Sequence, residues 1–197
     1  MNRLLALTLA VTVSSLLGAC APGLKSYADP TYRKVMAKQL TPLNPPQKVR
    51  IEVQFKQQGE PKPDSDLRLR GHVERALAAS GVLTSDPQAP SVLRVVVNNV
   101  GDMGEARKAG IKSGLSFGLA GSIVADEYQF SIIYTDAAGK KKDVFSRHIM
   151  RTAVGDAALP AGIEPRTPSV AFGQIVEDAV VAAIDQWQEA HVIGGRP

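Results

Sequence analysis

The sequence has a single cysteine, Cys20, and few aromatic residues, which make up 5% of the chain. One cysteine excludes a disulfide within the chain and a metal site built from several thiolates. An unpaired thiol is also unusual in an exported protein, so Cys20 needs an explanation of its own. So few aromatic side chains give no sign of a stacking platform for nucleic-acid bases or sugars.

A strong excess of one charge is absent as well. The chain has 23 Lys and Arg residues against 19 Asp and Glu residues, a net charge of +4. Basic residues alternate with acidic ones over most of the chain, whereas nucleic-acid-binding proteins concentrate them in one basic footprint. We therefore expect no nucleic-acid partner.

Motifs for metal or nucleotide chemistry are also missing. The three histidines, His72, His148 and His191, have no second histidine or cysteine at the spacing of metal ligands. The sequence contains neither a Walker loop nor a G-x-G-x-x-G fingerprint. We expect no metal, no cofactor and no catalytic activity.

The N-terminus predicts export. Arg3 is followed by an apolar run from Leu4 to Leu17 and then by small residues, the layout of a secretory signal over residues 1–19. The apolar run is shorter than the roughly 20 residues that a membrane-spanning helix needs. One interpretation is an ordinary cleaved secretory signal that happens to end near a cysteine; the other is a lipoprotein signal.

The residues Leu17-Gly18-Ala19-Cys20 resemble the lipobox of bacterial lipoproteins. That resemblance implies that Cys20 becomes the N-terminus and carries lipid, which anchors the chain to a membrane. In Gram-negative lipoproteins the absence of aspartate at the next position, here Ala21, implies sorting to the outer membrane. The expected location is therefore the outer membrane, with the protein facing the periplasm or the cell surface.

After the cysteine, residues 20–47 hold five prolines and little apolar periodicity, which predicts a linker. Residues 48–190 are expected to form one domain, followed by a tail at 191–197. Val49 to Phe55 alternate with polar residues like a half-buried strand. Leu69 to Ser80 then predict a helix capped by Asp64, Ser65 or Asp66 and ended by Gly81. The apolar run 91–100 predicts a central strand covered on both faces.

The second half predicts a hairpin and a closing helix. Tyr128 to Tyr134 alternate, residues 136–143 form a loop, and residues 144–154 return as a strand. Thr167 and Pro168 suit the start of a helix whose apolar stripe runs from Ile175 to Trp187. The expected fold is α+β, a two-layer α/β sandwich with about four mixed strands and two helices on one face. The second strand should pair parallel to the first through a right-handed crossover.

This order of elements, with Cys20 and a glycine-rich apolar segment, resembles the TraT-type outer-membrane lipoproteins of conjugation. The resemblance implies a role in the cell envelope, because TraT-type proteins are implicated in surface exclusion and complement resistance. It lies in the layout of the chain and includes few individual residues.

The glycine-rich segment, residues 110–125, places Gly110, Gly114 and Gly118 in one row if it is helical, beside Leu115, Phe117 and Leu119. Small residues at this spacing let helices approach closely in lipid. Its 13 uncharged residues rise only about 20 Å as a helix, too little for a single crossing. Three interpretations stay open: a structural loop, a segment dipping into the membrane, and a packing surface for another copy or a partner.

The only basic run, Lys140, Lys141 and Lys142, falls at the predicted hairpin tip. It is either a solvated turn that discourages edge-to-edge association or a contact for anionic lipid or a cell-wall polymer. The sequence thus favours a membrane-anchored, non-catalytic module for protein interaction or assembly, partnered by an envelope protein or by itself. The alternative is a module that binds anionic lipid or cell-wall polymer through the basic loop.

Overall fold

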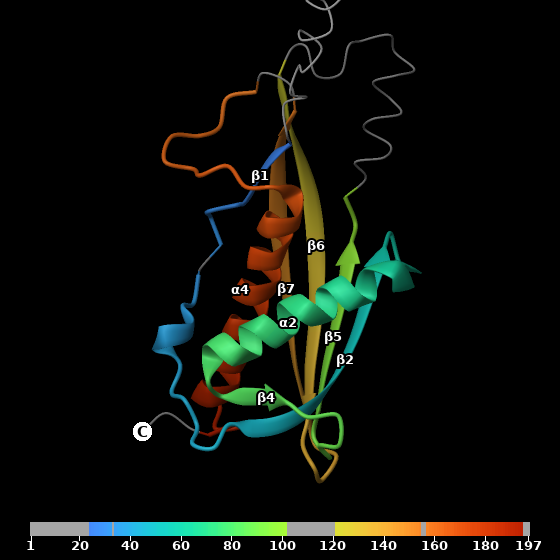
Figure 1. The fold of residues 1–197 in the computed structure, drawn as a ribbon, viewed down its shortest axis with the longest axis vertical. Helices are drawn as coiled ribbons and strands as arrows, with labels where there is room; N and C mark the ends of the chain where they lie inside the picture. The colour runs from blue at the N-terminus through green and yellow to red at the C-terminus, as the bar shows by residue number, and fades with distance from the viewer. Residues whose placement is uncertain (1–23, 33, 102–120, 155–156, 195–197) are drawn as a thin grey trace, which may run out of the picture.

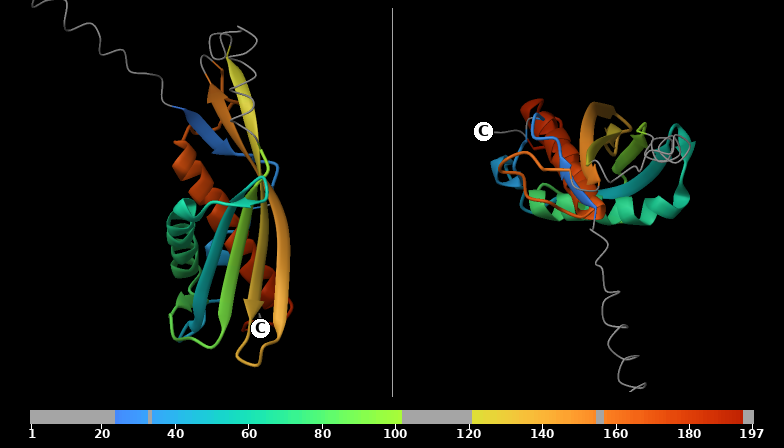
Figure 2. Two further views of the ribbon diagram at one scale, coloured as in Figure 1. Left: turned by 90° about the vertical axis from the view of Figure 1, so that its right-hand side faces the viewer. Right: turned by 90° about the horizontal axis from the view of Figure 1, so that it is seen from above.

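A computed structural model describes residues 24–32, 34–101, 121–154 and 157–194. Its centre is a mixed sheet of seven strands in the order β1-β7-β6-β5-β2-β3, with β4 paired to β2. The α-helices α2 and α4 both lie on one face of this sheet (Figures 1 and 2). We call the opposite side the open face. The strands are β1 (Lys25–Ala28), β2 (Gln47–Gln57), β3 (Glu60–Pro61), β4 (Leu83–Ser85), β5 (Val92–Asn99), β6 (Ser122–Thr135) and β7 (Lys141–Val154).

The mixed α/β class and the two helices on one face agree with the sequence prediction, but the number of strands does not. About four strands were expected, and the sheet has seven. The additional strands are β1, β3 and β4, which have 4, 2 and 3 residues. Segments this short contain too few alternating residues to stand out from the neighbouring chain, so the apolar pattern does not reveal them.

The first unit of the fold is the crossover from β2 to β5. The two strands pair in parallel, with Arg50 opposite Val92 and Gln57 opposite Asn99, as expected. The helix between them, α2 (Asp66–Ser80), follows a 3-10 turn at Pro63–Ser65 and ends at Gly81, whose φ of 63° is left-handed. Glycine tolerates that conformation without strain.

The start of α2 differs from the expected cap. Ser65 takes the N-cap position without a side-chain hydrogen bond to the helix. The carboxylate of Asp66 turns to the sheet and accepts a hydrogen bond from the backbone N–H of Phe55 at 2.6 Å. This acidic residue therefore joins the helix to the strand instead of capping the helix.

The sequence predicted that strand β5 is covered on both faces, but the structure covers only one. Leu93, Val95 and Val97 point toward the helices and are fully buried, whereas Arg94 on the open face is exposed. Val92 and Val96 share that face and are half-buried. Apolar residues therefore occupy the open face of β5 as well as its buried face. For this reason the sequence resembles that of a strand buried on both faces.

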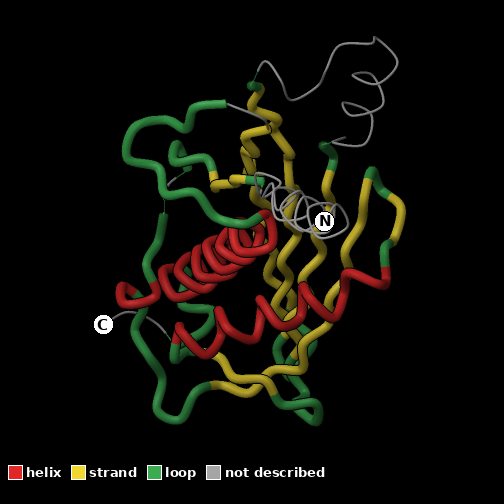
Figure 3. Tube along the Cα trace, turned by 45° about the horizontal axis from the view of Figure 1, so that its top comes forward, coloured by secondary structure: helices red, strands yellow, loops and turns green. Residues whose placement is uncertain are grey.

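A long hairpin and the second helix complete the layers. Strands β6 and β7 pair antiparallel over their whole length, from Ser122 opposite Val154 to Thr135 opposite Lys141. Helix α4 (Pro168–Glu189) begins as predicted, with Pro168 in the first turn and the Thr167 side chain accepting from the N–H of Val170. Its buried stripe packs on the sheet beside α2 (Figure 3).

Residues 20–47, expected to be a linker, belong to the fold from Lys25 onward. Strand β1 pairs antiparallel with β7, and the buried hydroxyls of Ser26 and Thr152 are 2.8 Å apart across the pair. The chain then passes a 3-10 turn at Ala37–Gln39, and Leu40 joins the hydrophobic core. In the expected C-terminal tail, Ile193 is also buried in the core.

The β1 end of the sheet and the β6–β7 turn lie far apart. Lys25 pairs with Ala153, twelve residues along β7 from Lys141, which is about 40 Å at the rise of an extended strand. Figure 1 shows β1 at one end of the molecule and the β6–β7 turn at the other. Within the described residues, no helix has the length and apolar character to cross a membrane.

Candidate functional site

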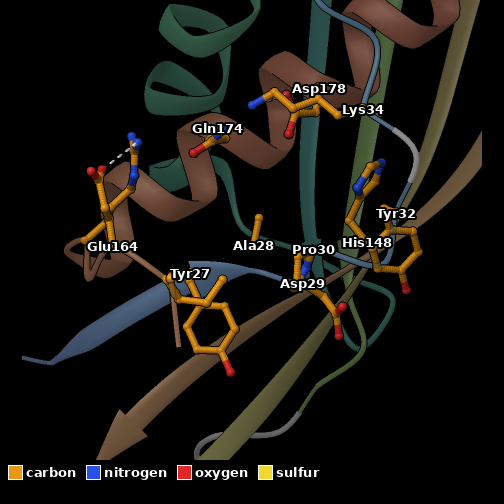
Figure 4. Close-up of a pocket in the computed structure, with 13 residues that line it drawn as sticks. Tyr27, Ala28, Asp29, Pro30, Tyr32, Lys34, His148, Glu164, Gln174 and Asp178 are labelled. Atoms are coloured by element: carbon orange, nitrogen blue, oxygen red, sulfur yellow. Dashed lines mark ion pairs between the residues drawn. The ribbon is translucent and has the colours of Figure 1, made fainter. Parts of the chain in front are cut away.

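A cavity of about 430 Å³ opens between β1, β7, α4 and the loop before α4 (Figure 4). Its walls combine two tyrosines, three acidic residues, a lysine, an arginine and a histidine. We call it the β1 pocket. Its lining residues are Tyr27, Ala28, Asp29, Pro30, Tyr32, Lys34, His148, Gly162, Ile163, Glu164, Arg166, Gln174 and Asp178.

Asp29 is the best-connected group of the β1 pocket. Its carboxylate accepts hydrogen bonds from the N–H and hydroxyl of Thr31, at 3.0 and 2.7 Å. Arg151 donates to the other oxygen through Nε at 2.8 Å and Nη2 at 2.7 Å. The Thr31 hydrogen bonds, followed by Arg151, lower the pKa of Asp29. The carboxylate therefore stays charged and its acceptor positions are occupied by the chain itself.

His148 forms the floor of the pocket. Its ring lies 5.1 Å from that of Tyr32 and 5.5 Å from that of Phe130, centroid to centroid. Burial lowers the pKa of His148, because the cationic ring would lose its hydration. The ring is therefore neutral at pH 7 and packs as an aromatic residue.

On the α4 side the polar groups are also paired. Lys34 lies 3.4 Å from the carboxylate of Asp178, and Arg166 lies 3.8 Å from Glu164. Burial raises the pKa of Asp178, and Lys34 opposes that effect. The Lys34–Asp178 pair joins the segment after β1 to α4, and the Arg166–Glu164 pair lies within the loop before α4.

The polar groups of the β1 pocket attach the N-terminal segment, residues 25–34, to the rest of the domain. Backbone hydrogen bonds between Ser26 and Arg166, at 2.7 and 3.0 Å, add the loop before α4 to the outer side of β1. No group of three metal-ligating side chains occurs in the ranges of the chain that the structure describes. The Asp29–Arg151 and Lys34–Asp178 ion pairs hold the N-terminal segment against β7 and α4.

The two buried histidines predict a dependence of stability on pH. The pKa values of His72 and His148 are lowered mainly by burial, whereas an unfolded chain has histidines near 6.5. Between pH 7 and 5 the unfolded state thus binds more protons, and the free energy of unfolding should fall as the pH falls. The stability supplied by neutral histidines is complete above about pH 7 and is lost through this window.

Urea titrations at pH 7 and 5 would measure this. We expect His148→Gln to remove about half of the pH-dependent loss, and the exposed His191→Asn control to keep all of it. Asp178, whose pKa is raised, should stabilise the fold as the pH falls. It is present in the parent chain and in both variants, so it does not affect the comparison. An equal loss in His148→Gln and the parent chain would contradict the prediction.

The second candidate surface is the outer edge of β7. Strand β1 pairs only with Met150–Ala153, and the N–H of Asp29 donates to the carbonyl of Ile149 at 2.8 Å. Among the described strands, none pairs with residues 141–148 on that side. We call these residues the β7 edge. Phe145, at its centre, is 70% exposed.

The opposite edge of the sheet is closed by side chains of α2. Arg70 donates to the carbonyl of Ile51 at 2.9 Å, and Asp66 accepts from the N–H of Phe55. The N–H of Lys62 donates to the Phe55 carbonyl at 2.9 Å. Covering an edge in this way is a usual defence against strand addition, and no described strand covers the outer side of residues 141–148.

The residues singled out in the sequence are placed in different regions. Lys140 is exposed in the β6–β7 turn, and Lys141 and Lys142 are exposed at the start of β7, where they begin the β7 edge. Gly110, Gly114, Leu115, Phe117, Gly118 and Leu119 lie outside the described residues. The end of the same segment, Ser122–Ala125, is β-strand in β6, so a helix cannot extend that far.

The glycine-rich segment also contains Gly114-Leu115-Ser116-Phe117-Gly118. These residues match the G-x-S-x-G spacing of a nucleophile elbow, which sits between a strand and a helix and needs a histidine base. The expectation of no catalytic activity did not take this match into account. The motif lies outside the described residues, and the absence of catalysis stays a prediction.

The sequence did not reveal the β1 pocket or the β7 edge. The pocket depends on β1, whose four residues show no period. The edge strand reads DVFSRHI, with apolar residues on both faces, so the alternation does not identify Phe145 as exposed. The one available signal was the break between the regular pattern of 128–134 and the less regular pattern of 144–154.

Comparison with known proteins finds no matching family model and no matching curated protein. Three solved structures are similar to this chain at low sequence identity. A minor lipoprotein from Acinetobacter baumannii is 18% identical over 77% of this chain and 97% of that chain, with a TM-score of 0.36. A PelC dodecamer from Paraburkholderia phytofirmans is 14% identical over 82% and 93%, with a TM-score of 0.32.

The third is the rare lipoprotein B from Shewanella oneidensis, 14% identical over 72% of this chain and 93% of that chain, with a TM-score of 0.30. Two of the three are thus named lipoproteins, and none is a TraT-type protein. At these TM-scores the likeness is one of general layout, and it assigns this chain neither a family nor a function.

Proposed function

We propose that the chain is a lipoprotein of the cell envelope, anchored to the outer membrane through Cys20, and that its domain is a non-catalytic module for protein interaction or assembly. The lipobox residues support the anchor, and the β7 edge supports the interaction. The second observation is the one on which the function depends, because an open strand edge offers unpaired N–H and C=O groups to another chain.

The position of β1 limits how far the domain can lie from a membrane that holds Cys20. From Cys20 to Lys25 there are five residues, which span at most about 18 Å when fully extended. The β1 end of the sheet therefore stays close to the membrane. The β6–β7 turn, about 40 Å away along β7, extends beyond the lipid surface whenever the domain stands upright.

This geometry weighs against lipid as the target of the basic loop. Lys140–Lys142 are at the turn, the part of the sheet farthest from the anchor. They reach the membrane that holds Cys20 only when the domain lies flat. A basic patch attracts anionic lipid within about a Debye length, near 8–10 Å. Cell-wall polymer, which lies farther from the membrane, is the form of the alternative that agrees better with the fold.

Photo-crosslinking in intact cells tests the proposal. A benzophenone amino acid in place of Phe145 keeps an aromatic ring at the β7 edge, and the same group in place of Ala78, exposed on α2, is the matched control. We expect a discrete protein adduct from position 145 and none from position 78.

The nature of the adduct separates the candidate functions. A protein adduct of defined mass supports the interaction module. Adducts confined to lipid or cell-wall fractions, released by salt, would instead favour binding through the neighbouring lysines. The same weak smear from both positions would contradict a specific use of the β7 edge.

A further inference from the structure

We propose that the β7 edge binds a second copy of this chain, by antiparallel pairing of the two β7 strands centred on Phe145. The pairing joins two sheets into one continuous sheet across a two-fold axis. It rests on the proposed function, because it names the partner of the same edge.

A hydrogen bond next to β1 shows which backbone groups of β7 point away from β6. The Ile149 carbonyl points away from β6, since it accepts from Asp29. Backbone groups alternate along a strand, so Phe145 and Arg147 also direct their N–H and C=O groups outward, and Asp143 does the same. The free stretch ends at Asp29 on one side and at the β6–β7 turn on the other. Pairing centred on Phe145 uses the five residues of this stretch from Asp143 to Arg147.

Charge selects one register from those that this stretch allows. Centred on Phe145, antiparallel pairing places Asp143 of each copy opposite Arg147 of the other. Centring on Asp143 or on Arg147 places like charges directly opposite, which destabilises a sheet. Centring on Val144 places Lys141 opposite Arg147, and centring on Ser146 pairs no charges at all. Centring on Lys142 pairs Lys141 with Asp143 but places the two Lys142 side chains directly opposite each other. Among the registers centred on residues 143–147, only that of Phe145 forms two ion pairs.

The same register gives the exposed aromatic ring a partner. The two Phe145 side chains become a directly opposed pair on the open face, with Cα atoms about 5.5 Å apart, and such aromatic pairs stabilise antiparallel strands. On either side of them lie the ion pairs of Asp143 and Arg147. Each ring thus loses much of its 70% exposure.

The dimer is weak in solution and favoured on a membrane. Five paired residues on each side bury well under the roughly 1,200 Å² of a stable interface. Antiparallel pairing directs the two β1 ends in opposite directions, so copies anchored in one membrane pair with their strands lying along its surface. Held there by their lipid, they meet at a much higher effective concentration than free copies. Lys141 and Lys142 flank the pairing and limit its extension, in keeping with their place beside an open edge.

Cysteine trapping tests the register directly. Cys20 is the only cysteine, so the full chain with Cys20→Ala is a cysteine-free background. Mixing the Asp143→Cys chain with the Arg147→Cys chain should give a disulfide-linked dimer, and the second Asp143–Arg147 pair of that dimer stays intact. Either chain alone should not, because like positions are four residues apart, about 13 Å, beyond the reach of a disulfide.

Charge exchange tests the energetics by sedimentation over a concentration series. Asp143→Arg and Arg147→Asp should each weaken the dimer about tenfold, and the double exchange should restore it to within about threefold. Exchange of Arg94→Asp, exposed on the open face of β5 away from the edge, is the matched control and should change nothing.

The outcomes separate this inference from the proposed function. Trapping in the mixture alone, with rescue by the double exchange, supports the dimer. Trapping in single chains, or charge exchanges without effect, overturns it. If position 145 in cells then crosslinks to a different protein, the interaction module stands without self-association. An adduct of twice the mass of the chain supports both.

Discussion

Replacing Cys20 with alanine should abolish lipid labelling and move the protein from the membrane fraction to the soluble fraction. Cys20 is the only cysteine of the chain, so no other thiol can take the lipid. Each buried methylene of an acyl chain contributes about 0.8 kcal/mol to membrane binding. Loss of the chains should therefore lower the membrane-bound share by orders of magnitude.

Metabolic labelling with a radioactive fatty acid, followed by fractionation, measures both effects. Ala21→Ser is the matched control, because it changes a neighbouring residue and leaves the thiol. The domain itself should fold equally well in both variants. Membrane association that persists in the unlabelled Cys20→Ala chain would mean that another part of the protein provides the main attachment.

The parts of the fold that the sequence predicted are those with strong local patterns. Val49 to Phe55 alternate along β2, and Gly81 ends α2 in the left-handed conformation that glycine favours. Thr167 and Pro168 start α4 as a cap and a first-turn proline should. Each of these signals lies within a few residues of the element it defines.

The parts that it did not predict depend on contacts between distant residues. Strand β1 exists because Lys25–Ala28 pair with Met150–Ala153, more than 120 residues later. The prolines of residues 20–47 suggested a linker, yet Leu40 is fixed in the core and Asp29 by Arg151. A proline-rich composition describes the local chain and does not exclude tertiary contacts.

The same reason explains the candidate sites. The β1 pocket forms only when β1 is part of the sheet. Because the sequence pattern does not predict β1, it does not predict the pocket. The β7 edge is an edge because β1 is short and, among the described strands, leaves residues 141–148 without a partner on their outer side. Phe145 becomes a candidate contact only once the strand order is known. The lysines beside it were visible in the sequence, but their distance from Cys20 was not.

Replacing Gly173 with valine should destabilise the domain by about 3 kcal/mol or more. Gly173 is buried on α4 where it meets α2, and a Cβ there would lie 2.5 Å from Nδ1 of His72. The ring packs edge-on against Phe172 and is hydrogen-bonded to Arg75, so moving it away from the new Cβ breaks both contacts. Overpacking a close contact costs about 1–3 kcal/mol, and separating the two helices adds to that cost.

Gly71→Val is the matched control, since Gly71 is also a helical glycine and a Cβ there meets only Arg75 Nη1, at 3.9 Å. Valine has a slightly higher helix propensity than glycine, so this change should leave the stability within about 0.5 kcal/mol. Urea unfolding of the two variants measures the difference. The α2–α4 contact sets the spacing of the helical layer over the sheet. Equal stabilities would therefore show that the helices separate at little cost and that His72 does not fix their distance.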